Sequence, residues 1–145
     1  MNIFFDTNVL VAASAQSHPH YTRAWPTVRR VASGEDQGFI AAHSIAEVYA
    51  ALTRLPVQPR IHPVEAERII VENLLRIFEV IPISKTEYVD ALTSVASKGW
   101  RGAKIYDALL LSCAAKCAAD RIYTFNLQDF QALASGETLA KICAP

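Results

Sequence analysis

Short apolar runs alternate along the chain with longer segments in which apolar residues recur every three or four positions. The short runs lie at 2–5 (NIFF), 39–42 (FIAA), 78–83 (FEVIPI) and 122–125 (IYTF), with a weaker one at 140–143, and the longer segments lie at 19–32, 45–54, 63–77, 86–97, 103–119 and 127–134. The short runs predict strands and the longer segments predict helices. Strands that alternate with helices are typical of parallel strands joined by right-handed crossovers. We therefore expect an α/β fold in which helices flank a short-stranded, central parallel sheet.

Turn and capping residues support these limits. Pro63 suits the first turn of a helix, and Ser84 followed by Glu87 has the spacing of a capping box. The proline-rich stretch 55–63 (LPVQPRIHP) predicts an irregular connection between two helices. Pro26 lies inside the helix expected at 19–32 and predicts a break or kink there, because proline cannot donate the intrahelical hydrogen bond.

The composition is typical of one globular domain. Of the 145 residues, 52% are apolar and 19% are charged, so we expect a single domain over 1–145. The 14 basic and 14 acidic side chains cancel, and net charge therefore gives no argument for a nucleic-acid partner. No apolar stretch approaches the roughly 20 residues that span a bilayer, and signal-peptide features are missing, which predicts a cytoplasmic protein without membrane contact. Cys113, Cys117 and Cys143 lack zinc-site spacing and are expected to be reduced core residues.

Asp107 stands near the start of a segment that is almost entirely apolar from 105 to 119. A carboxylate on a helix that is buried on most sides is costly unless it is paired or binds a metal ion. Alternatively, Asp107 is favoured by the helix dipole near the helix N-terminus and pairs with Lys104 or Arg101. The sequence leaves both interpretations open.

Two further polar groups follow predicted strands, and each also has two interpretations. Glu47 is the one acid on an apolar helix, but Ser44 and Glu47 have the spacing of a capping box, in which the glutamate only satisfies a backbone N–H. In the stretch RIYTFNLQDF, either Thr124 or Asn126 can cap the next helix. Asp129 is then a solvated acid of its first turn.

Asp6 directly follows the first predicted strand. A parallel α/β fold gathers such positions at the carboxyl edge of its sheet, where ligands bind. The polar groups that would meet there are Asp6, Glu47, Asp107 and the pair Asn126 and Asp129. Carboxylates brought together repel one another, so a divalent cation among them is favoured. With oxygen ligands and no nearby Cys or His, Mg²⁺ or Mn²⁺ is favoured over zinc, and such an ion supports phosphodiester hydrolysis.

Four stretches, taken in order, resemble the PIN-domain proteins, and in particular the VapC ribonuclease toxins of bacterial toxin–antitoxin pairs. They are FFDTNVLVA at the N-terminus, SIAEV around Glu47, IYDALLLSCA around Asp107 and IYTFNLQDF near the C-terminus. The resemblance covers essentially the whole chain and implies a PIN-like three-layer fold. It also implies metal-dependent endoribonuclease activity, an RNA substrate, an antitoxin partner and a homodimer.

The resemblance implies that Asp6, Glu47 and Asp107 bind Mg²⁺ or Mn²⁺ and take part in catalysis. Three polar residues are implied to orient these acids: Asn8, Ser44 and Thr124. Family members often carry an aspartate where this chain has Asn126. Because Asn126 supplies no negative charge, we expect Asp129 to serve as the fourth metal-binding and catalytic acid, with Asn126 as a neutral ligand or hydrogen-bond partner.

Basic residues around Trp100 are candidates for RNA binding, because they can meet phosphates while the indole stacks on a base. The expected RNA-binding residues are Arg54, Trp100, Arg101 and Lys104, with Lys98 beside them. Alternatively, this stretch is a solvated turn whose tryptophan packs on its own domain. His18, His20, His43 and His62 share no spacing typical of a ligand set and are expected to be caps or surface residues.

Two other functions stay open from the sequence. A non-catalytic PIN-like interaction module would use the acids only as structural caps, and the neutral Asn126 favours it. A PIN nuclease that acts in RNA maturation or on DNA would share the same metal site.

Overall fold

The fold is built on five parallel strands in the order β3-β2-β1-β4-β5. The computed structural model describes all of residues 1–145. The strands are β1 (Asn2–Phe5), β2 (Gln37–Ala41), β3 (Phe78–Ile81), β4 (Arg121–Tyr123) and β5 (Ile142–Cys143). Every pairing between neighbouring strands is parallel, so each connection crosses from the carboxyl end of one strand to the amino end of the next. The short parallel sheet expected from the sequence is confirmed, including its weak last strand.

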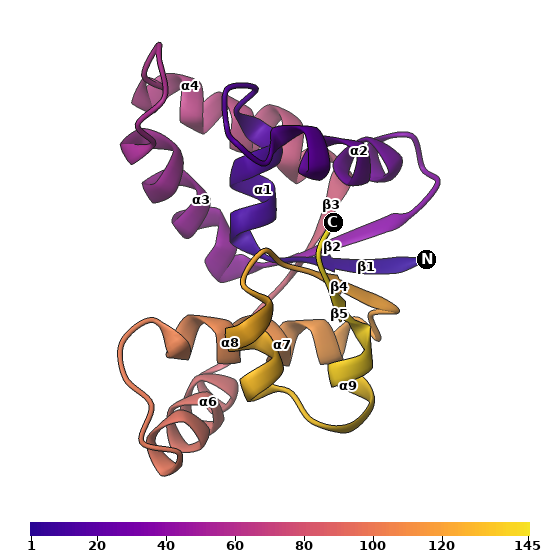
Figure 1. Ribbon diagram of the computed structural model, residues 1–145, viewed down its shortest axis with the longest axis vertical. Coiled ribbons are helices and arrows are strands. Elements are labelled where there is room, and N and C mark those ends of the chain that lie inside the picture. Colours follow the sequence, from indigo (N-terminus) through magenta and orange to yellow (C-terminus); the bar gives the residue numbers. More distant parts are fainter.

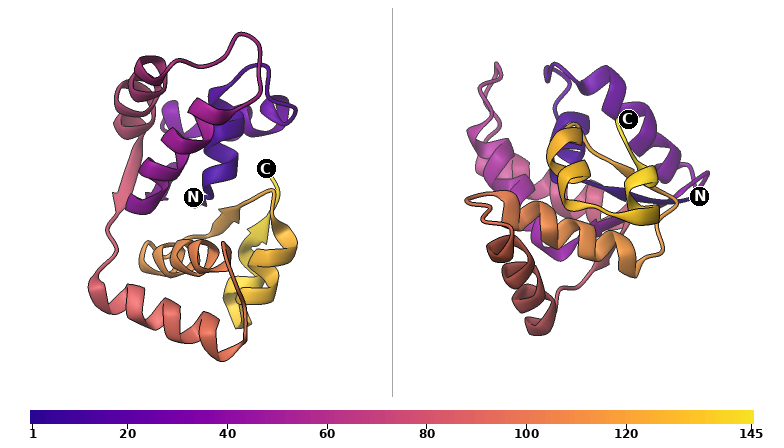
Figure 2. Two further views of the ribbon diagram at one scale, coloured as in Figure 1. Left: turned by 90° about the vertical axis from the view of Figure 1, so that its left-hand side faces the viewer. Right: turned by 60° about the horizontal axis from the view of Figure 1, so that its bottom comes forward.

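Helices cover both faces of the sheet and give three layers (Figure 1). One layer holds α1 (Thr7–Ser14), α2 (Tyr21–Ala32), α3 (Ala42–Arg54), α4 (Pro63–Arg68), the π-helical turn Ile69–Leu74 and α5 (Leu75–Ile77). The other layer holds α6 (Lys85–Ser97), α7 (Lys104–Lys116), α8 (Leu127–Leu133) and α9 (Gly136–Lys141). The turned views in Figure 2 show the same two groups of helices on either side of the strands. The predicted three-layer α/β architecture is therefore confirmed.

Alternation of side chains along β1 divides the core into two clusters. Ile3 and Phe5 belong to the cluster with α1, α2 and α3, whereas Phe4 between them belongs to the cluster with α7 and α8. None of the three is more than 1% exposed. Because both faces of the sheet are covered, these strand positions carry no polar side chain.

The chain reverses its direction of travel across the sheet at β1. β2 and β3 lie on one side of β1, and β4 and β5 lie on the other. In an open parallel sheet, the crevice at such a switch point is where ligands bind. The backbone N–H of Asp6, which follows β1, donates to the carbonyl oxygen of Tyr123 in β4 at 2.9 Å. This bond brings Asp6 beside Thr124, the residue that follows β4.

α1 is not among the helices expected from the sequence. Of its eight residues, Thr7 and the five from Val9 to Ala13 are buried. A helix that is buried on nearly all sides carries no amphipathic period, so its sequence reads only as an apolar run. α9 is also missing from the expected helices, because its six residues are too few to show a period.

Three expected helix limits differ in the structure. α2 runs without interruption through Pro26, so no break occurs there. Pro26 is exposed, and water can hydrate the carbonyl group that loses its intrahelical partner. α3 begins at Ala42 rather than at 45, and the π-helical turn Ile69–Leu74 divides the helix expected at 63–77.

Several local predictions are confirmed. The Ser84 hydroxyl accepts from the backbone N–H of Glu87 at 3.2 Å, and the Glu87 carboxylate accepts from the backbone N–H of Ser84 at 2.6 Å, which completes a capping box. The stretch between α3 and α4 is irregular. The three cysteines are free and are buried or half-buried. No helix combines the length and apolar character that crossing a bilayer requires.

Gly38 in β2 is predicted to be a packing constraint of the sheet. A Cβ at this position would lie 2.6 Å from two ring carbons of Phe78 and 2.7 Å from Cγ1 of Val31. Because both neighbours are buried, the Gly38→Ala variant should lose about 1–3 kcal/mol of unfolding free energy through overpacking. Urea denaturation measures this loss, with Gln37→Ala at the exposed neighbouring position as the control. Equal stability of the two variants would contradict the packing argument.

Candidate active site

Asp6 lies between β1 and α1, at the N-cap position of α1, and its carboxylate is buried. The residue is 4% exposed, and its Oδ2 accepts a hydrogen bond of 2.6 Å from the Thr124 hydroxyl. Burial raises the pKa of Asp6 to about 6, because the charged form loses hydration, and the Thr124 hydrogen bond opposes the rise. None of the ion pairs of the protein involves Asp6. Its negative charge is therefore only partly compensated.

Glu47 projects from α3 toward the first turn of α1. The Thr7 hydroxyl lies within hydrogen-bond distance of both the Ser44 hydroxyl (3.1 Å) and Glu47 Oε1 (3.3 Å). Because α3 begins at Ala42, Ser44 is its third residue and does not cap it. The capping-box interpretation of Glu47 is therefore wrong. Burial raises the pKa of Glu47, and the nearby His43 opposes the rise.

Asp107 lies in the first turn of α7. Burial, followed by the negative charge of Asp6, raises the pKa of Asp107 to about 7. The ion pair with Lys104 or Arg101 that the sequence left open does not form, since Lys104 pairs with Asp129 instead. Asp107 is therefore an acid whose charge is opposed by its surroundings, as expected for a ligand of an absent cation or for a proton-binding group.

The three acids line one cavity of about 390 Å³ at the switch point of the sheet. They come from three separate parts of the chain, namely the end of β1, the second turn of α3 and the first turn of α7. The structure thus brings Asp6, Glu47 and Asp107 together, as expected for a parallel sheet. Of the residues expected to orient them, Asn8 lines the same cavity, and Ser44 and Thr124 are completely buried beside it.

Asn126 connects Asp107 with Asp129 at the edge of this cavity. Its Nδ2 donates to Asp129 Oδ2 at 2.8 Å and lies 3.4 Å from Asp107 Oδ2. Asn126 occupies the N-cap position of α8, but its side chain makes no capping bond. Asp129 does not line the cavity, and the Lys104 ammonium group beside it lowers its pKa. Asp129 is therefore paired with Lys104 outside the cavity, although its charge still contributes to the raised pKa of Asp107.

The acids suit a hard divalent cation in chemical type and in charge. Every acidic ligand offers oxygen atoms, and the raised pKa values of Asp6 and Asp107 show that their ionised forms are disfavoured, a cost that a bound cation would offset. In the structure as it stands, no three His, Cys, Asp or Glu side chains converge closely enough to hold an ion. Metal binding would therefore require the carboxylates to turn toward one another.

The residues expected to bind RNA lie outside the acidic cavity, at two places. Arg54 lines a neighbouring cavity of about 590 Å³, and Glu47 lines both this cavity and the acidic one. Trp100 has two ammonium groups over its ring, with Lys98 Nζ at 4.8 Å and Lys104 Nζ at 5.6 Å from the ring centroid. Arg101 beside it is exposed. Around Trp100 the chain thus presents a basic and aromatic surface.

Three ring side chains are among the residues that line the acidic cavity without having been indicated by the sequence. They are His18 and His20, from the loop between α1 and α2, and Phe125, which follows β4. The His20 ring stacks on the Phe125 ring with centroids 4.5 Å apart. The two rings come from distant parts of the chain and belong to no periodic pattern, so the sequence carries no signal for their contact.

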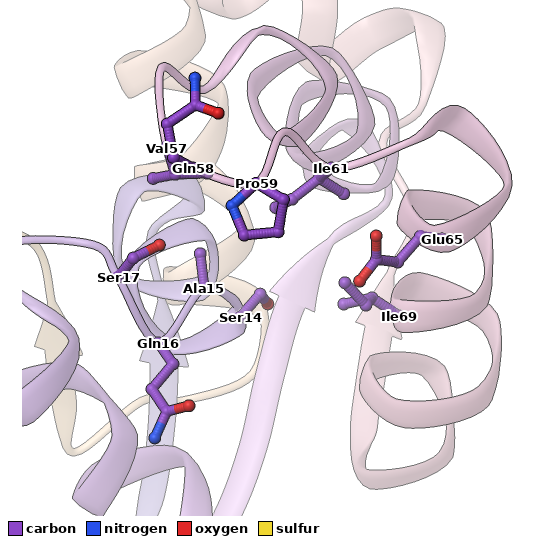
Figure 3. Close-up of a pocket in the computed structure, with 10 residues that line it drawn as sticks. All are labelled: Ser14, Ala15, Gln16, Ser17, Val57, Gln58, Pro59, Ile61, Glu65 and Ile69. Atoms are coloured by element: carbon purple, nitrogen blue, oxygen red, sulfur yellow. The ribbon is translucent and has the colours of Figure 1, made fainter.

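A second cavity, of about 490 Å³, lies at the C-terminal end of α1 (Figure 3). It is lined by Ser14 at the end of α1, by the loop residues 15–17, by the irregular stretch from 57 to 61, and by Glu65 and Ile69, and Glu65 is its one charged lining residue. None of the residues expected to bind metal or RNA lines this cavity. The cavity with the three acids is therefore the candidate active site.

A family model of the PIN domain matches residues 3–135. The chain belongs to the PIN-domain family. This PIN domain is also 28% identical over 117 residues to Ribonuclease VapC27 of Mycobacterium tuberculosis, a match that covers 79% of the chain and 78% of that relative. The resemblance to PIN-domain and VapC proteins that the four sequence motifs indicated is confirmed.

Solved structures of similar fold agree with this assignment. VapC20 of Mycobacterium tuberculosis, described as a sarcin-ricin loop cleaving toxin, aligns with a TM-score of 0.69 at 21% identity over 93% of this PIN domain and 97% of that chain. VapBC2 of Rickettsia felis, bound to a DNA fragment from its promoter, aligns with a TM-score of 0.65 at 20% identity over 99% and 98%. At these identities the likeness shows a shared fold.

The pKa values of the site predict how the stability of the metal-free PIN domain depends on pH. In the unfolded chain Asp6 and Asp107 lose their protons near pH 3.8, but in the folded protein they hold them to about pH 6 and about pH 7. The folded state therefore binds more protons between about pH 4 and about pH 7, and stability falls as the pH rises through this window.

Melting temperatures measured in EDTA from pH 5 to pH 8 should therefore fall more steeply for the wild type than for an Asp107→Asn variant. Comparing the two proteins cancels the opposite contribution of His18, whose pKa is lowered by burial. Parallel curves would show that Asp107 titrates normally in the folded protein.

Proposed function

We propose that this PIN domain is a metal-dependent endoribonuclease that acts in the cytoplasm as the toxin of a toxin–antitoxin pair. The observation that carries this proposal is the convergence of Asp6, Glu47 and Asp107 on one cavity at the switch point of the sheet. The likeness to Ribonuclease VapC27 supports RNA cleavage rather than another use of the fold. Because VapC20 is described as cleaving the sarcin-ricin loop, we propose a structured RNA as the substrate.

Mg²⁺ or Mn²⁺ is the proposed cofactor, with Asp6, Glu47 and Asp107 as its ligands. When bound, such an ion activates a water molecule and offsets the charge that develops on the phosphate oxygens. The protein's own part is to position the acids. The Thr124 hydroxyl fixes one oxygen of Asp6, and the Thr7 hydroxyl contacts Glu47 Oε1.

Asn8 and Ser44 are proposed to hold this arrangement from behind the acids. Asn8 Oδ1 accepts from the backbone N–H of Phe125 at 3.2 Å, and its Nδ2 lies 3.5 Å from Thr124 Oγ1, so it ties the first turn of α1 to the end of β4. Ser44 is completely buried against the Thr7 hydroxyl. These bonds limit how far the carboxylates move when a cation binds.

Asp129 is proposed to act as an auxiliary acid through Asn126. Its charge is paired with Lys104, and its Oδ2 accepts from Asn126 Nδ2. It can reach the cavity only if the ion pair opens. Lys104, when released in this way, is free to contact an RNA phosphate together with Arg101 and Trp100, and Arg54 is proposed to do so on the other side of the site.

RNA and an antitoxin are the proposed partners, and the Rickettsia VapBC2 assembly supports the second of them. We also propose a homodimer through an apolar groove of about 610 Å³ between α3 and α4. Tyr49, Val64 and Val71 line this groove with exposed fractions of 42%, 55% and 52%. Light scattering of the purified protein and of a Val71→Asp variant tests the dimer.

A non-catalytic interaction module is the second candidate function. Two observations favour it: Asn126 is neutral, and the acids do not converge into a ready ligand set. A module of this kind would bind its partner without cleaving RNA in any divalent metal. A nuclease of RNA maturation or of DNA would instead cleave without being toxic when expressed.

Replacing either of two central acids should abolish cleavage. Asp6→Asn and Asp107→Asn remove ligand charge and should lower the cleavage rate of a structured RNA at least about 100-fold in Mg²⁺ or Mn²⁺. Asp90→Asn, at an exposed position on α6, is the matched control and should cleave as the wild type does. Gel assays of labelled RNA fragments measure the rates. Metal-independent cleavage, or full activity of both site variants, would overturn the proposed function.

Asn126→Asp should strengthen divalent-cation binding. The side chain lies 3.4 Å from Asp107 Oδ2, so a carboxylate there adds a fourth negative ligand to the site. The rise in melting temperature on adding Mg²⁺ should therefore be larger for this variant than for the wild type, while its metal-free form should be less stable because of repulsion. A Mg²⁺-induced shift equal to that of the wild type would place the ion away from this edge.

A further inference from the structure

The cavity that holds the acids has a second end that is not acidic. His18, His20 and Phe125 line this end, and no Lys or Arg lines the cavity anywhere. RNA is a polyanion, and three carboxylates repel it unless cationic or stacking groups compensate. The histidine end therefore has the groups, inside the cavity itself, that can receive an RNA strand.

His20, Phe125 and Arg23 form a stacked group, called here the His20 stack. The His20 and Phe125 rings are inclined by 20° with centroids 4.5 Å apart, and the Arg23 guanidinium carbon lies 5.4 Å from the Phe125 centroid. The Asn8 side chain accepts from the backbone N–H of Phe125, which fixes the stack relative to the first turn of α1. His20 is exposed, so part of its ring stays open to a ligand.

His18 adds a hydrogen-bond donor beside this stack. Its Nδ1 accepts from the backbone N–H of His20 at 3.0 Å, and the two ring centroids lie 5.7 Å apart. Because Nδ1 is used as an acceptor, the neutral ring carries its proton on Nε2. His18 can therefore donate through Nε2 to an oxygen of a bound phosphate.

The His20 stack lies beside the acids. Phe125 directly follows Thr124, whose hydroxyl donates to Asp6 Oδ2, and the backbone N–H of Phe125 donates to Asn8, two residues after Asp6. No cluster of His with acids forms a metal site. Substrate binding is the role that the position of the stack allows.

We propose that the His20 stack is the subsite for an unpaired RNA base close to the cleaved phosphate, with Arg23 and His18 contacting an adjoining phosphate. This inference rests on the proposed ribonuclease function. A base in a duplex has both faces covered by its neighbours, whereas an unpaired base can lie on the imidazole ring. The subsite therefore directs cleavage to unpaired segments of a structured RNA.

Binding of a fluorescein-labelled single-stranded RNA, followed by anisotropy in an Asp107→Asn background, tests the subsite without cleavage. His20→Ala should weaken binding about 10-fold, whereas His20→Phe keeps a stacking ring and should stay within about 3-fold. Arg23→Ala should weaken binding, and Arg60→Ala, at an exposed arginine in the stretch between α3 and α4, is its matched control. Because His20 is exposed, melting temperatures should not change.

A walk of single abasic nucleotides along the same RNA separates stacking from a structural role of His20. One abasic position should weaken binding to the protein with His20 intact and have no further effect on the His20→Ala variant, because both changes remove the same contact. If His20 only stabilises the loop between α1 and α2, each abasic nucleotide should reduce RNA affinity equally in the protein with His20 and in the His20→Ala variant.

The outcomes for the subsite and for the ribonuclease are distinguishable. Cleavage by the wild type together with unchanged binding by His20→Ala overturns the subsite and leaves the ribonuclease standing. If the His20→Ala change and one abasic nucleotide weaken RNA binding non-additively, but no divalent metal supports cleavage, the base subsite stands and the ribonuclease function is overturned. Absence of RNA binding in the Asp107→Asn protein overturns the subsite directly.

Discussion

The pairing of β1 with β4 is the constraint on which the site depends. Because the two strands are parallel and adjacent, Asp6 and Thr124 follow them at the same end of the sheet. The Thr124 hydroxyl donates to the Asp6 carboxylate at 2.6 Å. The sheet order reverses at this point, so α1 starts there from one layer and α7 and α8 approach from the other. Asn8 joins this contact, because its Nδ2 lies 3.5 Å from Thr124 Oγ1.

Negative charge is concentrated at this point beyond what the surrounding groups neutralise. Hydroxyl and amide groups compensate part of it, yet burial and mutual repulsion still raise the pKa of Asp6 to about 6 and of Asp107 to about 7. Such an arrangement is unfavourable for the isolated fold and is typical of functional sites, where stability is reduced in favour of chemistry. The same cavity is also lined by the rings of His18, His20 and Phe125, which carry no negative charge.

The order and type of most elements follow from local sequence. Strand residues such as Ile3, Phe4 and Phe5 are continuously apolar because both faces of the sheet are covered, and the capping box at Ser84 marks a helix start without reference to any distant residue. The sequence did not predict α1, because a helix that is buried on nearly all sides lacks the alternation of apolar and polar residues by which a helix is recognised.

The sequence by itself determined that the acids lie after strands or near helix starts, and it thereby predicted that Asp6, Glu47 and Asp107 meet at one edge of the sheet. Only the tertiary structure decided which charges are compensated. Lys104 pairs with Asp129 rather than with Asp107, and His20 reaches Phe125 from the far end of α1. Strand direction and burial are encoded by neighbouring residues, whereas an ion pair or a ring stack depends on distances between segments that no local pattern records.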